Sequence, residues 1–205
     1  EHDLNEIYQN LIDLMRMASQ LESEPKFISL TNQRETFTLF EKETGTPIHN
    51  AIVWQCTRGQ KYCDEITNNP TISNRITQKT GLKANSFFSA SKLQWVLHNK
   101  PEIKKKFDNG SILFGTIDTY LLYRLSNCQN YITDTTNASR TLLFNCLENK
   151  WDEDLLSIFK ITKSIALPIV KSSSDHFGDS DFEKCFSKKI PIIGVVGDAQ
   201  GSFFG

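Results

Sequence analysis

The stretch I-P-I-I-G-V-V-G-D-A-Q-G-S-F-F-G, at residues 190–205, decides the fold. Its β-branched apolar run, from Ile192 to Val196, is typical of a strand buried on both faces of an α/β sheet. The run stops at Gly197, and a carboxylate, Asp198, follows directly. In open α/β sheets, ligands bind beyond the carboxyl ends of the strands. The stretch therefore predicts an α/β fold with Asp198 at the ligand-binding edge of its sheet.

Two interpretations of Asp198 follow from its position. A carboxylate held at the end of a rigid strand is well placed to act as a general base. The glycines around it, at 194, 197 and 201, allow backbone or substrate to approach without a Cβ in the way. Aspartate is also a favoured N-cap, so Asp198 could simply begin a helix. The stretch alone leaves both open.

Composition sets the class of the protein. With 39% hydrophobic and 23% charged residues in 205, the chain can bury a sizeable core. A net charge of −1 gives no electrostatic footprint for nucleic acid or an anionic membrane. No apolar run approaches the roughly 18 residues of a spanning helix, and no signal segment opens the chain. The five cysteines are scattered and odd in number, which favours free thiols and a cytoplasmic location.

Periodicity divides the chain into alternating elements. Apolar residues at three- and four-residue spacing predict an amphipathic helix over 4–21. Further helices are expected at 57–67, around Leu93, at 116–124 and at 151–159, and strands at 26–30, 37–40, 51–54, 112–114 and 131–133. Residues 71–87 are mostly polar and are expected to be irregular, and residues 134–141 form a hydroxyl-rich connection.

Between the first two expected strands lies a polar run, Asn32 to Thr36. Arg34 brings a fork of donors and Glu35 a pair of acceptors, so together they suit a vicinal diol. The alternative is a solvated turn with an incidental charge pair. Adjacent residues on an extended strand point to opposite faces, so the residues alone leave both interpretations open.

Three other features have ordinary structural explanations. Trp54, at the end of an expected strand, is usual as core, although its flat face also suits the carbon backbone of a small polyol. The basic segment 104–106 is typical of a solvated face. His176 has no nucleophile beside it in the pattern, so no role is assigned to it.

Several long motifs carry a resemblance to a known family. They are N-Q-R-E-T at 32–36, E-T-G-T-P-I-H-N-A-I-V-W-Q at 43–55, F-G-T-I-D-T-Y-L-L at 114–122, T-N-A-S-R-T-L-L-F-N at 136–145 and G-V-V-G-D-A-Q at 194–200. The chain resembles the FGGY carbohydrate kinases, and within that family the glycerol kinases. The motifs occur in the family's order and extend through most of the chain, which makes the resemblance specific.

The resemblance implies an actin-like ATPase fold of the ribonuclease H-like kind, with ATP and Mg²⁺ in a cleft between two domains. The implied reaction transfers the γ-phosphoryl group of ATP to the terminal hydroxyl of glycerol, giving sn-glycerol 3-phosphate. Arg34 and Glu35 match the residues that bind glycerol, and Asp198 matches the catalytic base. The implied partner is therefore a small polyol, and the longer protein is expected to be a homo-oligomer.

The resemblance also has gaps. Phe87 stands where the family has a tyrosine that contacts substrate, and Ala199 stands where it has a glutamine. Residues 1–205 are expected to be most of the N-terminal, substrate-side domain, with the phosphate loop before Glu1 and the nucleotide-binding domain after Gly205. The isolated chain is accordingly expected to be inactive. A kinase for another polyol or sugar, and a non-catalytic relative, are the alternatives.

Overall fold

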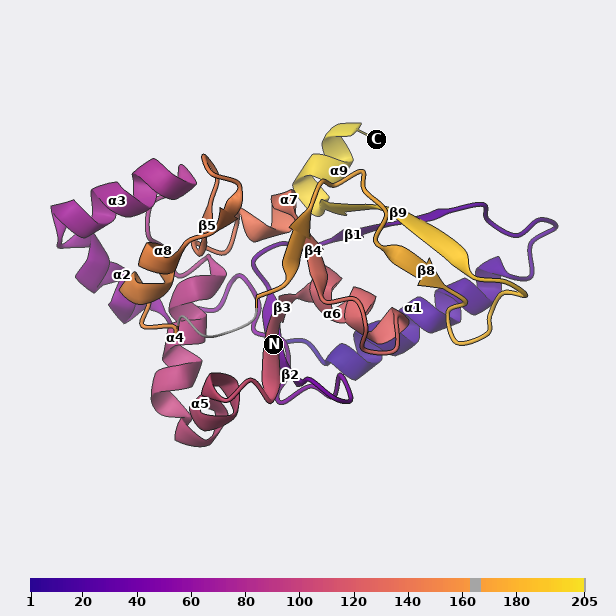
Figure 1. The fold of residues 1–205 in the computed structure, drawn as a ribbon, viewed down its shortest axis with the longest axis horizontal. Helices are drawn as coiled ribbons and strands as arrows, with labels where there is room; N and C mark the ends of the chain where they lie inside the picture. The colour runs from indigo at the N-terminus through magenta and orange to yellow at the C-terminus, as the bar shows by residue number, and fades with distance from the viewer. Residues whose placement is uncertain (163–166, 205) are drawn as a thin grey trace.

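A computed structural model describes residues 1–162 and 167–204. The chain forms an elongated α/β body (Figure 1). One end consists mainly of helices, and the other contains a sheet packed on the first helix of the chain. The helices are α1 Leu4–Ala18, α2 Gln60–Thr67, α3 Pro70–Thr80, α4 Ser89–Asn99, α5 Pro101–Asp108, α6 Ile117–Leu125, α7 Thr135–Ala138, α8 Glu153–Ile158 and α9 Asp198–Phe204. The strands are β1 Ile28–Asn32, β2 Phe37–Glu41, β3 Ile112–Thr116, β4 Ile132–Asp134, β5 Phe144–Asn145, β6 Lys150–Trp151, β7 Ile169–Lys171, β8 Gly178–Ser180 and β9 Ile190–Gly197.

The sheet that positions the candidate site has the order β1-β9-β8. Strands β1 and β9 run parallel, and their register ends with Asn32 opposite Gly197. Strand β8 is antiparallel to β9. Three two-stranded ladders complete the described strands: β2 with β3, β4 with β7, and β5 with β6.

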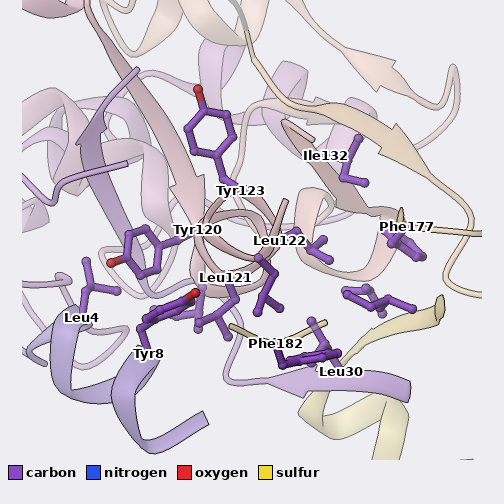
Figure 2. Close-up of a cluster of buried hydrophobic side chains, with 14 of the residues drawn as sticks. Leu4, Tyr8, Leu30, Tyr120, Leu121, Leu122, Tyr123, Ile132, Phe177 and Phe182 are labelled. Carbon is purple, nitrogen blue, oxygen red and sulfur yellow. The ribbon is translucent and has the colours of Figure 1, made fainter. Parts of the chain in front are cut away.

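The first hydrophobic core lies under this sheet. Asp3 is the N-cap of helix α1, and its carboxylate accepts the N–H of Asn5 at 2.8 Å. It buries Leu4, Tyr8 and Ile12 at a four-residue spacing. Figure 2 shows that Leu4 and Tyr8 face Tyr120 and its neighbours on α6, with residues of β1 and the β8 region alongside, and Ile12 belongs to the same core. The amphipathic helix expected near the N-terminus is confirmed, and it ends at Ala18, three residues earlier than predicted.

The second core fills the helical end of the molecule. It contains side chains of α3, α4, α5 and α8, among them Ile76, Leu93, Phe107 and Leu155. The β2–β3 ribbon separates the two cores, because its residues alternate between them. Phe114 belongs to the second core, whereas the adjacent Leu113 belongs to the first. This period of two is the ordinary geometry of a strand, and here it joins both ends of the fold.

Two expectations about local structure are wrong. Residues 71–87 are not all irregular, because α3 covers most of the first half. Its signals were in the sequence: Asn69 accepts the N–H of Ile72 as N-cap, Pro70 begins the helix, and Gly81 ends it with a φ of 72°. The expected strand at 51–54 is reduced to single bridges, Ala51 with His2 and Ile52 with Phe37.

The expectation that the final strand is buried on both faces is also wrong. Along β9 buried residues alternate with more accessible ones, and the side chain of Ile193 is 39% exposed. The buried face, with Ile192 and Val195, packs into the first core. The hydroxyl-rich connection after β4 contains the short helix α7.

Asp152 connects three elements at the helical end. It is 7% exposed and accepts both N–H groups at the start of α8. Its two oxygens also accept from Nζ of Lys79 on α3, at 2.8 and 2.9 Å, and it accepts Nδ2 of Asn145 on β5 at 3.0 Å. Burial opposes ionisation, but the hydrogen bonds from Lys79, the Leu155 N–H and Asn145 prevail and lower the pKa of Asp152 from 3.8 to about 2.

We therefore expect Asp152→Asn to lower the free energy of unfolding by about 2 kcal/mol at pH 7. Because the folded pKa lies below the unfolded one, this contribution is complete above pH 3.8 and is lost as the pH falls toward 2. Urea unfolding at several pH values measures it. Asp154→Asn is the matched control: this carboxylate pairs with the same lysine but its side chain is 31% exposed. We expect a loss below about 1 kcal/mol there, and equal losses in the two variants would contradict the assignment.

Candidate functional site

The parallel pairing of β1 and β9 creates the candidate site. Parallel strands bring their carboxyl ends to one edge of a sheet. Arg34 follows β1 and Asp198 follows β9, so residues 164 positions apart in sequence become neighbours. Nε of Arg34 lies 3.2 Å from Oδ1 of Asp198. The structure thus unites two of the residues that the sequence singled out.

A glycine permits this close approach. An ideal Cβ on Gly197 would lie 2.3 Å from Cδ of Arg34 and 2.6 Å from Cγ. Real Cβ atoms do not occur at such distances, so any other residue would displace the arginine side chain. The backbone N–H of Gly197 is itself fixed, because it donates to Oγ1 of Thr136 on α7 at 2.7 Å.

Asp198 is the first residue of α9, and its side chain is 54% exposed. Oδ1 accepts the N–H of Ala199 at 2.7 Å and also faces Arg34. Within residues 1–162 and 167–204, Oδ1 accepts both hydrogen bonds to this carboxylate, and Oδ2 accepts none. The carboxylate therefore makes a local bond to the next residue through Oδ1, and its Oδ2 has no hydrogen bond from the described residues. A role as base stays a prediction.

The buried carboxylate of Asp134 stabilises the junction between β9 and α9 through hydrogen bonds. Asp134 is fully buried and accepts the N–H groups of Thr136 and Asn137, both at 3.0 Å. It also accepts the hydroxyls of Thr136 and Ser173, both at 2.7 Å. Since the Thr136 hydroxyl donates to Asp134, its lone pairs are available to the N–H of Gly197. This chain of bonds fixes the residue that precedes Asp198.

Glu35 lies in a turn and not on an extended strand. Its φ is 61°, and the N–H of Thr36 donates to the carbonyl of Arg34 at 2.6 Å. The objection that adjacent strand residues point to opposite faces therefore does not apply to Arg34 and Glu35. Glu35 is 3% exposed, its backbone carbonyl accepts the hydroxyl of Ser89 at 2.8 Å, and its carboxylate accepts Nε of Arg140 at 2.6 Å.

Aromatic rings lie beside Arg140, the partner of this carboxylate. The rings of Trp54 and Phe87 have centroids 5.0 Å apart. The guanidinium of Arg140 lies 4.8 Å from the ring centroid of Phe88 and 5.9 Å from that of Phe87. The backbone N–H of Trp54 donates to Oγ1 of Thr36, the residue after Glu35, at 3.2 Å. This bond connects the aromatic rings to the turn that carries Arg34 and Glu35.

Arg140 is the residue that sequence reasoning missed. Its only signal in the sequence is its place in the motif T-N-A-S-R-T, within the hydroxyl-rich connection at residues 134–141. The structure instead places Arg140 as the cationic partner of the buried Glu35. Nothing in the spacing of residues 35 and 140 indicates that contact.

Taken together, the site offers donors from Arg34, acceptors from Glu35 and Asp198, and apolar ring faces from Trp54 and Phe87. Alternating hydroxyls and C–H groups of a small polyol match such a surface. A separate hollow of about 430 Å³, lined by Trp95 and Ile103 among others, contains none of these residues.

Two negative findings apply to residues 1–162 and 167–204. No three or more His, Cys, Asp or Glu side chains are grouped so that they could hold a metal ion. No helix there has the length and apolar character to cross a membrane.

Comparison with known sequences identifies the class. The profile of the FGGY family of carbohydrate kinases, N-terminal domain, matches residues 1–205, and the chain belongs to this family. It is 44% identical over 209 residues to "Glycerol kinase 1" of Thermotoga maritima, covering 100% of the chain and 42% of the relative. It is 48% identical over 178 residues to a glycerol kinase of Clostridium botulinum, and this match covers 87% of the chain and 35% of the relative. The chain thus spans well under half the length of these relatives.

Solved structures agree with this assignment. Glycerol kinase of Plasmodium falciparum with ADP superimposes with a TM-score of 0.90 at 40% identity, covering 98% of this chain and 41% of that one. Gluconate kinase of Lactobacillus acidophilus, at 22% identity and a TM-score of 0.86, supports the fold alone. The predicted actin-like ATPase fold and the resemblance to the FGGY family are both confirmed.

We expect Arg140→Ala to destabilise the protein by about 3 kcal/mol, because it leaves the buried carboxylate of Glu35 without its cation. Urea unfolding measures the change. Arg75→Ala is the matched control, since its pair with Asp154 at 2.5 Å is far more exposed, with 46% and 31% of the two side chains accessible. We expect a loss below about 1 kcal/mol for that variant. A similar small loss for Arg140→Ala would show that Glu35 does not depend on it.

Proposed function

We propose that this chain is the substrate-side domain of an ATP-dependent glycerol kinase. The contact of Arg34 with Asp198, at the joint end of two parallel strands and beside the buried Glu35, is the observation that carries the proposal. The glycerol kinases of Thermotoga maritima and Plasmodium falciparum, at 44% and 40% identity, support it. The product is sn-glycerol 3-phosphate.

In this proposal Arg34 and Glu35 bind adjacent hydroxyls of glycerol. The arginine donates a hydrogen bond to one hydroxyl oxygen, and the glutamate accepts a hydrogen bond from another hydroxyl. Arg140 fixes the orientation of the Glu35 carboxylate through its bond at 2.6 Å. Trp54 and Phe87 cover the carbon backbone and exclude water from that side.

Asp198 acts as the general base. Its accessible oxygen takes the proton of the terminal hydroxyl while the hydroxyl oxygen forms a bond to the γ-phosphorus of ATP, and the bond from that phosphorus to the ADP oxygen breaks. Arg34 and the N–H of Ala199 hold the carboxylate in position through Oδ1.

ATP and Mg²⁺ complete the proposed reaction. Mg²⁺ would neutralise charge on the transferred phosphoryl group when bound. It usually takes one or two carboxylates plus phosphate oxygens and water. No carboxylate of the described residues is assigned to it, because the open oxygen of Asp198 serves as the base and no group of three or more His, Cys, Asp or Glu side chains there could hold a metal ion. The phosphate loop and the nucleotide-binding domain are assigned to parts of the longer protein outside residues 1–205, so the isolated chain is expected to be inactive. A cytoplasmic, homo-oligomeric enzyme is part of the same proposal.

Asp198→Asn in the full-length protein should reduce kcat for ATP-dependent glycerol phosphorylation by about 10²–10⁴-fold, because the amide cannot accept the proton. A coupled assay for ADP release, with and without glycerol, measures it. Asp179→Asn is the control, since this exposed carboxylate on β8 contacts only His176 among the recorded bonds of the described residues. Near-normal kcat in Asp198→Asn would exclude the base assignment. No turnover of glycerol or other polyols by the wild type would favour a non-catalytic relative.

A second prediction concerns Phe87 and Ala199, the two positions where the chain departs from the family. By the family resemblance, Phe87→Tyr and Ala199→Gln each add a polar group next to substrate. One added neutral hydrogen bond contributes about 0.5–1.5 kcal/mol, so kcat/KM for glycerol should rise roughly 2- to 10-fold in each variant. Steady-state kinetics with glycerol and with longer polyols measure the effect. A rise for a longer polyol but not for glycerol would identify a sibling kinase of different specificity.

A further inference from the structure

Lys92 is a buried cation that the proposed mechanism does not use. It lies on α4 and is fully buried. A lysine is rarely buried unless its ammonium is satisfied, because transfer of an unpaired charge from water is strongly unfavourable. The surroundings of this ammonium therefore have to explain its presence.

Two consecutive backbone carbonyls accept hydrogen bonds from the Lys92 ammonium. Nζ of Lys92 donates to the carbonyl of Ser86 at 2.8 Å and to that of Phe87 at 2.7 Å. Long side chains on a helix point toward its N-terminus, so Lys92 reaches back across the first turn of α4 to the segment that enters the helix. That segment carries the Phe87 ring.

The ammonium also interacts electrostatically with Glu35, a residue of the candidate site. Burial lowers the pKa of Lys92 to about 8, and attraction to Cys56 and Glu35 opposes that effect. The group is thus mainly protonated at pH 7. The same helix binds the glutamate turn directly, since Ser89 donates its hydroxyl to the carbonyl of Glu35 at 2.8 Å.

Other contacts also hold this segment, including the guanidinium of Arg140 over the rings of Phe87 and Phe88. The side chain of Asn85 accepts the N–H of Phe87 at 2.8 Å, and the hydroxyl of Ser86 donates to Gln60 at 2.6 Å. Lys92 alone, among the recorded side-chain bonds of residues 1–162 and 167–204, reaches the carbonyl of Phe87. The carbonyls of Ser86 and Phe87 belong to the two peptide groups on either side of the Phe87 Cα, so fixing them fixes the direction of the ring toward Trp54.

We propose that Lys92 is a positioning residue for the polyol: by binding the carbonyls of Ser86 and Phe87, it fixes the Phe87 ring against Trp54 and so shapes the apolar wall of the site. This inference rests on the proposed function. Lys92 does not touch the substrate in this proposal, and it acts through Phe87.

The test is a double-mutant cycle in the full-length protein. Lys92→Met keeps the length of the side chain and removes its donors. We expect KM for glycerol to rise on the order of tenfold with a smaller change in kcat, and KM for ATP to stay unchanged. In a Phe87→Ala background, Lys92→Met should no longer change KM for glycerol, because the ring it positions is absent. Lys83→Met, an exposed lysine just upstream of this segment, is the control.

Several outcomes separate this inference from the proposed function. An inactive wild type with glycerol would overturn the proposed function and the inference with it. An active wild type with additive effects of Lys92→Met and Phe87→Ala, or with equal rises in KM for glycerol and ATP, would overturn the inference alone. If Lys92→Met does not fold, Lys92→Gln, which retains an N–H donor, is measured in the same cycle. The same loss of effect in the Phe87→Ala background would then support the proposal, and additivity would overturn it.

Discussion

The parallel pairing of β1 with β9 is the constraint on which the rest of the structure depends. It places Asn32 opposite Gly197 and so brings the residues after both strands to one edge. The cores on either side of the β2–β3 ribbon keep this sheet in a fixed relation to the helical end, from which Arg140 and the aromatic rings come. A change of register by one residue would turn the inward side chains outward and separate Arg34 from Asp198.

Buried charges surround this edge, and each is satisfied by a different kind of partner. Glu35 has the guanidinium of Arg140, Asp134 has hydroxyls and backbone N–H groups, and Lys92 has backbone carbonyls. Charges in such surroundings are tolerated only in well-satisfied positions. They add little net stability, but they restrict the backbone to one arrangement at the turn of Glu35, at the start of α4 and before Asp198. Such pre-organisation suits a site that must hold a small and flexible polyol.

The agreement between sequence and structure differs from one element to another. The amphipathic α1 was predictable, because its side-chain period reflects one buried face. The strands β9 and β2 were predictable from their apolar and alternating residues, although β9 is buried on one face and β2 on both. Helix α3 was missed because its residues are mostly polar, although Asn69, Pro70 and Gly81 mark its ends. Arg34, Glu35 and Asp198 were found partly from residue chemistry and partly from the family resemblance. Arg140 and Lys92 were not, because their partners lie 105 residues away or are backbone carbonyls, which leave no trace in residue type.

The sequence by itself determined the α/β class, the family and the identity of the polar groups at the candidate site. These depend on local periodicity and on motifs, which are properties of short stretches of chain. Only the tertiary structure decided which groups meet: that Arg34 faces Asp198 across a glycine, that Glu35 bonds to Arg140, and that Lys92 binds the segment carrying Phe87. The physical reason is that contacts between distant residues depend on strand register and on the packing of two cores. Neither is encoded in any single stretch of the chain.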